Sequence, residues 1–530
     1  MKCDSIDYAS SHLVRPLIKD YLLEKETTQS LYAFAPTHTN LKKAIKERRS
    51  FPIDRNLLKS QLLAQYESLG KLPAATKKQI NLLAENDTFT ITTGHQLNLF
   101  GGSKYFIYKI VEVIKYTEQL KEEFPDLNFV PIFWMASEDH DFDEINHARI
   151  GDKMVSWTTE EKGAVGPFDP KEILPIVRKE LDELWKTEPV TGSFLENLFS
   201  EAYHKPSLAE ATRYWVHALF YAKGLVILDG NDKELKRAFS SRMKDELVEQ
   251  KCIQAVEKTN EFLEQQDYHL QVFARPINVF HLSKEGRFLL QKDSNGYFTA
   301  ENDKQWTQEE LLAELDEYPE RFSPNALMRP LYQECVLPNL AYVGGAGEIA
   351  YWLQLKSAFE AFDIFFPQAV VRNSFLFITE RQHKKTEKLD IPFSKYFQKE
   401  DDFIVDFAEN RPELPDIFAQ NKAIQEAWKS LAKSVESSYP ALKQQIEIQE
   451  ASAHKELKRM RQEWRKNIKT KNAKELKILL DSYHHFFPNG SFQERYESFI
   501  PEYLAMGSGY FDILFDAIQP TKAEIVLIKY

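Results

Sequence analysis

The stretch that decides the fold reads TFTITTGHQLNLFGGSKYFIYKI at residues 88–110 and VPIFWMASEDHDFDEINH at residues 130–147. Phe89 and Ile91 alternate with threonines, which is typical of a half-buried strand. Apolar residues then recur at spacings of three and four, the pattern of a helix that packs on a sheet: Phe106, Ile110, Val113, Thr117 and Leu120. The nearly continuous apolar run at 130–136 indicates a strand buried on both faces, as in a parallel sheet. The stretch therefore predicts strand, helix and strand of an α/β fold.

A polar, glycine-containing loop follows the first strand and precedes the helix. Open α/β sheets bind ligands at the carboxyl ends of their strands, and a helix start with glycines suits an anion. The loop supplies His95 as a candidate catalytic residue and these candidate binding residues: Gly94, Gln96, Asn98, Gly101, Gly102 and Lys104. It matches neither GxxxxGK[ST] nor GxGxxG, and glycines also serve turns that need positive φ. The pattern alone leaves an anion site and a simple turn equally open.

The second strand ends in the densest ionisable cluster of the chain, which gives the candidate catalytic residues Glu138, Asp139, His140 and Asp143. Carboxylates this close raise one another's pKa, which is how a general acid or base is made. If the segment is helical, Asp139, Asp143 and His147 share one face, so a metal site is an alternative that we favour less. The simplest alternative is that the acids only stabilise a helix start through its dipole. We favour a functional site, because that alternative does not explain a histidine among five acids.

Further candidates lie later in the chain. Asp229 ends another buried strand, at 225–228, and so joins the polar groups at strand ends. A second glycine loop opens a helix and could bind a nucleotide or an amino acid, with two polar residues upstream of it: Asn325, Arg329, Gly344, Gly345, Gly347 and Glu348. Without further context, a tight strand-to-helix connection explains the second loop somewhat better.

Length and composition limit the class of protein. A chain of 530 residues is too long for one core, and its net charge of -12 argues against a dedicated nucleic-acid binder. The amino terminus lacks the apolar core of a signal peptide, and no run approaches the roughly 18 apolar residues of a membrane span. The three scattered cysteines indicate neither disulfides nor a thiolate zinc site. We expect a soluble, cytoplasmic protein that does not bind membranes.

The composition along the chain predicts four parts. These are a helical segment at 1–85, an α/β core at 86–380, a helical coiled-coil arm at 381–485 and a C-terminal segment at 486–530 that docks back on the core. Within the core we expect an insertion at about 151–205, of which Gly151 to Pro189 reads as loop, and another at about 270–320, a small β subdomain. The apolar run at 525–528 could add an edge strand or dock on the core. The basic stretch at 455–477 is either a solvated face or a surface for phosphate groups.

Several long motifs in register resemble one family. TGHQLNLFGGSKYFIYKI, PIFWMASEDHDFDEINH, GLVILDG and SPNALMRPLYQECVLPNLAYVGGAGEIAYWLQLK stand in the order and spacing of the BshC family of bacillithiol biosynthesis. The resemblance implies a Rossmann-like parallel-sheet core with inserted connecting segments, followed by a long antiparallel α-helical coiled-coil hairpin that supports a homodimer. It also implies the last step of bacillithiol assembly, in which the carboxyl of L-cysteine is joined to the amine of glucosaminyl-malate. Many relatives carry Gln where this chain has His95.

The implied reaction assigns roles to the candidates. A carboxylate must be activated before it condenses with an amine, so ATP with Mg²⁺ is the expected second substrate, through a cysteinyl adenylate or an acyl phosphate. The glycine loops would hold phosphates of ATP or ADP, and His95 and Lys104 would stabilise charge on the leaving group. The acidic cluster would bind the incoming ammonium and remove its proton. No tightly bound metal is expected.

Two other classes of protein compete with the ligase. The first is a nucleotide-binding scaffold protein of the same pathway, in which the coiled coil recruits partners and no turnover occurs. The second is a metal-dependent hydrolase built on the acidic cluster.

Overall fold

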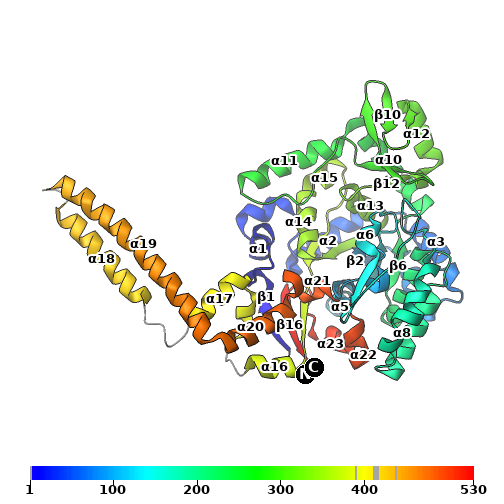
Figure 1. Ribbon diagram of the computed structural model, residues 1–530. Helices are drawn as coiled ribbons and strands as arrows, with labels where there is room; N and C mark the ends of the chain where they lie inside the picture. Colours follow the sequence, from blue (N-terminus) through cyan, green and yellow to red (C-terminus); the bar gives the residue numbers. More distant parts are fainter. Residues whose placement is uncertain (1–2, 388–390, 410–416, 436–438) are drawn as a thin grey trace.

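A five-stranded parallel sheet forms the centre of the molecule in the computed structural model, which describes residues 3–387, 391–409, 417–435 and 439–530 (Figure 1). Its strands lie in the order β14 (Gln368–Val371), β13 (Asn339–Gly344), β2 (Thr88–His95), β3 (Asn128–Met135) and β6 (Val226–Asp229). The chain runs outward from β2 through β3 to β6 and then returns to β13 on the other side of β2. The order therefore reverses between β2 and β13, where doubly wound sheets bind ligands. This confirms the predicted Rossmann-like core.

The connecting helices pack on this sheet. The predicted apolar helix is α5 (Tyr105–Glu123), which packs on β2 and β3 and is buried at nearly every position from Phe106 to Ile114. The other helices that connect the strands or lead into them are α9 (Leu208–Phe220), α10 (Lys233–Glu249), α11 (Lys251–Gln265), α13 (Met328–Val336), α14 (Ala346–Gln354) and α15 (Lys356–Ala361). The sequence predicted one helix up to about residue 266. The structure has two, α10 and α11, because Gln250 between them is left-handed with φ 54°.

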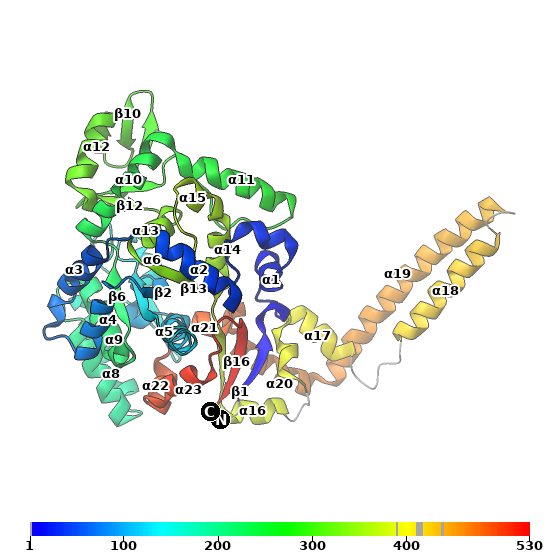
Figure 2. The ribbon, with the colours of Figure 1, turned by 180° about the vertical axis from the view of Figure 1, so that it is seen from behind.

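The two ends of the chain meet in a second sheet (Figures 1 and 2). The segment predicted as helical contains α1 (Pro16–Leu22), α2 (His38–Ser50), α3 (Arg55–Gln65) and α4 (Ala74–Leu82), but it begins with strand β1 (Cys3–Asp7). β1 pairs antiparallel with β16 (Glu524–Lys529), which pairs parallel with β15 (Ser374–Ile378). The apolar run near the C-terminus was expected to form an edge strand or to dock on the core. It forms the centre of this sheet instead.

Two insertions enlarge the core. The first holds β4 (His147–Ile150), β5 (Lys153–Ser156), α7 (Asp182–Trp185) and α8 (Pro189–Ala202). The sequence predicted loop from Gly151 to Pro189, but the structure has β5 and α7 within this stretch. Pro189 itself occupies the first helical position of α8, where its missing N–H is tolerated. The second holds two three-stranded sheets and α12 (Gln308–Glu317), with strands β7 (Val279–Leu282), β8 (Arg287–Leu289), β9 (Gln291–Asp293), β10 (Gly296–Thr299), β11 (Lys304–Trp306) and β12 (Phe322–Pro324).

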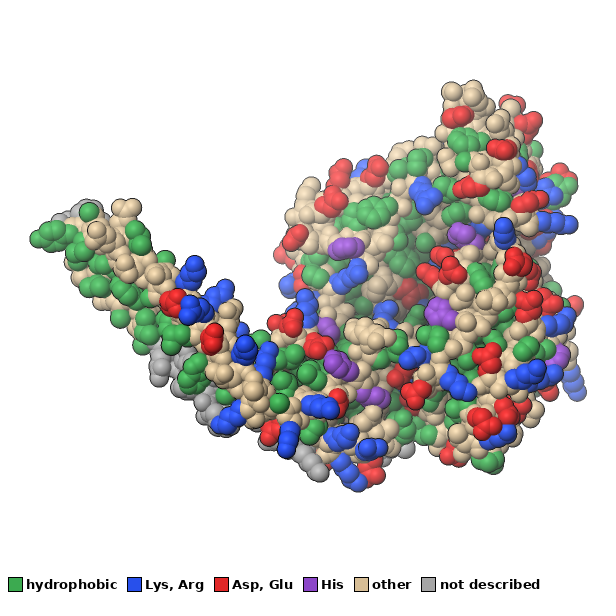
Figure 3. All heavy atoms as spheres, viewed as in Figure 1, with side chains coloured by type: hydrophobic (Ala, Val, Ile, Leu, Met, Phe, Trp, Pro, Cys, Tyr) green, Lys and Arg blue, Asp and Glu red, His purple; other side chains and the backbone are tan. Residues whose placement is uncertain are grey.

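A helical hairpin projects from the body (Figures 1 and 2). It consists of α18 (Ile417–Val435) and α19 (Pro440–Lys471), which pack side by side and confirm the predicted coiled-coil arm. Lys and Arg side chains lie along the side of the arm that faces the body (Figure 3). Apolar residues of the arm are also exposed, including Ile448 at 59% and Met460 at 55%. The homodimer expected through this arm stays a prediction.

The chain returns from the arm to the body through several short helices. At the base of the arm lie α16 (Glu380–Glu387), α17 (Glu400–Glu409) and α20 (Ala473–Phe486), and the C-terminal segment adds α21 (Gln493–Tyr496), α22 (Ile500–Met506) and α23 (Gly509–Ala517). Arg461 and Arg465 of the basic stretch bind Glu409 of α17, so part of that stretch stabilises the base of the arm.

In the part of the chain that the structure describes, no helix has the length and apolar character needed to span a membrane.

Candidate active site

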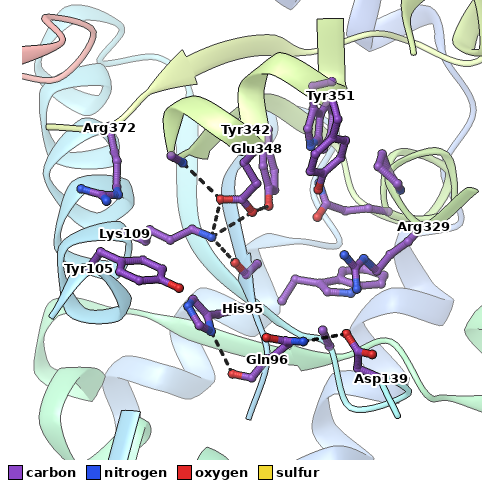
Figure 4. A pocket seen from close by; sticks show the side chains of 18 of the residues that line it. His95, Gln96, Tyr105, Lys109, Asp139, Arg329, Tyr342, Glu348, Tyr351 and Arg372 are labelled. Atoms are coloured by element: carbon purple, nitrogen blue, oxygen red, sulfur yellow. Dashed lines mark hydrogen bonds and ion pairs between the residues drawn. The ribbon is translucent and has the colours of Figure 1, made fainter. Parts of the chain in front are cut away.

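A pocket of about 460 Å³ opens at the point where the strand order reverses (Figure 4). It lies at the carboxyl ends of β2, β3 and β13, as the sequence predicted for ligand binding. Eight of the predicted site residues line it: Gly94, His95, Gln96, Asp139, Arg329, Gly345, Gly347 and Glu348. Both the first glycine loop and the second therefore contribute to one site.

A buried ion pair crosses the centre of the pocket. Lys109 of α5 is 3% exposed, and its Nζ lies 2.7 Å and 2.9 Å from the two carboxylate oxygens of Glu348 in α14. Lys109 Nζ also donates to the carbonyl oxygen of Gly94 at the end of β2. The pair thus joins α5, β2 and α14 across the point where the strand order reverses. No sequence motif had pointed to Lys109 as a site residue.

Glu348 is held ionised by its neighbours. Its Oε1 accepts from the Tyr342 hydroxyl at 2.6 Å, and its Oε2 accepts from the Gly345 N–H at 3.1 Å, which caps α14. Burial alone would raise the pKa of Glu348, but Lys109 and these two donors overcome that effect and lower it. Burial lowers the pKa of Lys109 in turn, and Glu348 opposes this shift.

Asp139 lies at one end of the pocket with Arg329 beside it (Figure 4). Gln96 Nε2 donates to Asp139 Oδ2 at 3.0 Å and to Glu144 Oε2 at 2.8 Å, so one amide orients two carboxylates. Burial would raise the pKa of Asp139, but His140, Arg329 and Gln96 together lower it below its ordinary range. Asp139 is therefore a fixed negative charge facing the cavity.

His95 forms part of the pocket wall between the rings of Tyr105 and Phe106, whose centroids lie 5.3 Å and 4.9 Å from its own. Its Nδ1 lies 3.1 Å from the carbonyl oxygen of Gln96, which can only accept. Nδ1 therefore carries the proton, and Nε2 keeps a free lone pair. Burial lowers the pKa of His95 to about 3, with a further contribution from Lys109, so the imidazole is neutral at physiological pH.

This shift predicts a pH dependence of stability. His95 has a pKa of about 3 in the folded protein and an ordinary value of 6.5 when unfolded, so between these values the unfolded chain binds the extra proton. Folding stability should fall as the pH drops below about 6.5, by up to about 1.4 kcal/mol per pH unit from this group. In denaturant titrations across this pH range, the free energy of unfolding of His95→Gln should fall less steeply with decreasing pH than that of the wild type. Parallel curves for the two proteins would contradict the assignment.

Cations gather at the opposite end of the pocket. Arg372 follows β14, and Arg495 comes from α21 of the C-terminal segment, so two distant parts of the chain meet there. Their guanidinium carbons lie 5.4 Å and 5.6 Å from the ring centroid of Tyr105. Glu494 binds Arg372 Nη2 at 2.6 Å with both side chains buried, and although burial opposes it, this pair raises the pKa of Arg372. Neither arginine nor Tyr105 was predicted from the sequence as a site residue.

Most of the other predicted residues serve the fold around the pocket. Gly101 and Gly102 adopt φ of 79° and 61° in the turn before α5, and Asn98 donates to the carbonyl oxygen of Glu144 at 3.1 Å. Asn325 accepts from the N–H groups of Leu327 and Met328 before α13, while Asp229 accepts from Ser137 and Asn231. Gly344 ends β13 just before the pocket. Lys104 is fully buried and paired with Glu497 and Glu502.

Of the acidic cluster, Asp139 and Glu144 line the pocket, whereas the other predicted members, Glu138, His140 and Asp143, do not. A metal site on one helical face would need a helix from Asp139 to His147. The only helix in this segment is the short α6 (Phe142–Ile145), so Asp139, Asp143 and His147 do not share a helical face. Glu138 pairs with Lys236, Asp143 is exposed, and His140 Nδ1 lies 3.1 Å from Arg287 Nη1. Among the residues that the structure describes, no group of three or more His, Cys, Asp or Glu side chains is arranged to hold a metal ion.

Comparison with known proteins shows the family of the chain that forms this pocket. Residues 1–373 match the model of the N-terminal Rossmann-like domain of BshC of bacillithiol biosynthesis, and residues 375–530 match its C-terminal coiled-coil domain. The chain belongs to the BshC family. Relatives named "Putative cysteine ligase BshC" are 37% identical in Flavobacterium johnsoniae, over 100% of both chains, and 36% identical in Cytophaga hutchinsonii, over 99% of both. The pocket thus uses both BshC domains, because Arg495 comes from the coiled-coil domain and the other lining residues from the Rossmann-like domain.

Proposed function

We propose that the protein is a ligase that joins the carboxyl of L-cysteine to the amine of glucosaminyl-malate in an ATP-driven reaction. The observation that carries the proposal is the pocket between β2 and β13. It combines basic side chains, which can bind an anion, with the ionised carboxylates of Asp139 and Glu348 in one cavity. Such a site can hold a charged acyl group and an amine together, and orientation of this kind supplies a large part of catalysis. The names of the relatives point to the same chemistry.

The two ends of the pocket suit different groups of the substrates. Asp139 is ionised and faces Arg329, so it can bind an ammonium group without itself taking a proton. The cations of the pocket can offset negative charge on a carboxylate or a phosphate while the carboxylate is activated; these cations are Lys109, Arg372 and Arg495. His95 offers the lone pair of Nε2 as an acceptor, a role that the glutamine of many relatives could also fill.

The direct test is a reaction of the purified protein with cysteine, glucosaminyl-malate, ATP and Mg²⁺, followed by mass spectrometry. We expect bacillithiol, with AMP if the route passes through an adenylate and ADP if it passes through an acyl phosphate. Asp139→Asn should lower turnover by about 10- to 100-fold, because it removes the charge that holds the amine. Asp141→Asn is the matched control, since Asp141 is an exposed member of the same acidic cluster outside the pocket.

The same experiment separates the ligase from the scaffold. Nucleotide binding without any thiol product would contradict the ligase and favour a nucleotide-binding scaffold. Loss of folding in Asp139→Asn, measured by circular dichroism, would show that the residue serves the fold and not the reaction.

A further inference from the structure

The cationic end of the pocket contains a buried donor that no group of the protein accepts. Arg372 is 3% exposed, and its Nη atoms are occupied by Glu494, the carbonyl oxygen of Asn373 and the Ser374 hydroxyl. Its Nε is buried and has no partner in the described part of the chain. Buried donors are rarely left unpaired, so an unpaired one in a ligand pocket indicates that a ligand accepts from it.

The second cation at this end is free to reach a ligand. Arg495 is exposed, and for the described residues no ion pair of its guanidinium is found. Arg372 Nε and Arg495 Nη2 approach the same point, since a Cβ built on Gly345 would lie 3.9 Å and 3.8 Å from them. The Nε–H of Arg372 and the guanidinium of Arg495 can therefore donate to one anionic group placed at that point.

The first turn of α14 faces the same space. Glu348 already accepts from the Gly345 N–H, but among the described residues no partner of the Ala346 or Gly347 N–H is found. The first N–H groups of a helix have no helical partner and suit a negative charge. Gly347 in this turn has an ordinary φ, and a Cβ added to it would meet nothing within 4 Å. Neither backbone conformation nor packing therefore requires glycine, although glycine weakens a helix. Because Gly347 lines the pocket, the missing side chain leaves room for a ligand against the backbone of this turn.

We propose that Arg372, Arg495 and the first turn of α14 form a subsite for an oxyanion of a substrate, a carboxylate or a phosphate group. Arg372 Nε–H and the guanidinium of Arg495 donate to the anion from one side, and the N–H groups of α14 donate from the other. The subsite exists independently of turnover, but which substrate carries the anion rests on the proposed function. The malate carboxylates and the phosphates of ATP are the two sources in that reaction.

Gly347→Ala tests the subsite, with Gly509→Ala as its matched control. Gly509 also lies in the first turn of a helix, α23, has open space around it and lies outside the pocket. Both variants should melt at or above the wild-type temperature, because alanine favours a helix. Only Gly347→Ala should weaken binding of an anion, by about tenfold or more, since its methyl group occupies the space of a charge-assisted hydrogen bond.

Malate and inorganic pyrophosphate serve as probes, each titrated by calorimetry into the full-length protein without the other substrates. Weaker binding of malate to Gly347→Ala assigns the subsite to the malate carboxylates, and weaker binding of pyrophosphate assigns it to the nucleotide. Arg495→Gln, a change of an exposed side chain, should weaken the same probe. The inference is overturned if the wild type binds neither probe or if Gly347→Ala binds both as tightly as Gly509→Ala does. It stands if the ligase assay fails but this pattern of binding is found.

Discussion

Lys109→Met is expected to destabilise the protein by about 2–3 kcal/mol and to abolish turnover. The substitution keeps the length of the side chain but leaves the half-buried carboxylate of Glu348, which is 24% exposed, without its cation, and it removes the donor to the Gly94 carbonyl. Denaturant unfolding of the two proteins gives the loss of stability, and the ligase assay gives the loss of turnover.

A double variant separates the two effects. Lys109→Met with Glu348→Gln has no buried charge at this place, so it should recover a large part of the lost stability. It should not recover turnover, because the pocket still lacks the cation that we propose to act on the carboxylate or phosphate. A double variant as unstable as the single one would contradict the ion-pair argument. A double variant with full activity would contradict a role of Lys109 in the reaction.

The sheet could be predicted from the sequence because its strands leave local patterns. Strands buried on both faces read as continuous apolar runs, as at 130–136, and the polar residues after them mark the edge where ligands bind. The sheet of β1, β15 and β16 could not be predicted in this way. It joins the two ends of the chain, and pairing between residues so far apart leaves no local pattern.

The site was predicted in part for the same reason. Asp139 and Glu348 lie close in sequence to strand ends, whereas Lys109 lies one turn inside a helix. A signal for it did exist, because a lysine within the apolar run of α5 must be paired when the helix is buried all round. Arg372 also follows an apolar strand, β14, and could have been found by the rule for strand ends. Arg495 reaches the pocket only through the tertiary fold.

Lys104 shows how a motif can mislead when tertiary contacts are unknown. The glycine loop before α5 suggested that this lysine binds a phosphate. In the structure its Nζ lies 2.7 Å from Glu497 and 2.6 Å from Glu502, both in the C-terminal segment. Burial opposes the charge of Lys104, but the two carboxylates together raise its pKa. The lysine thus ties α5 to the segment that also carries Arg495.

Lys104→Met should therefore destabilise the protein by about 3–5 kcal/mol, because Glu502 is left buried without a cation. In contrast to Lys109→Met, the fraction that stays folded at low temperature should keep turnover and its KM for ATP, since Lys104 does not line the pocket. Lys104→Met with Glu502→Gln should recover part of the stability. If Lys104→Met instead raised the KM for ATP without a loss of stability, Lys104 would act on the nucleotide, as the glycine loop alone suggested.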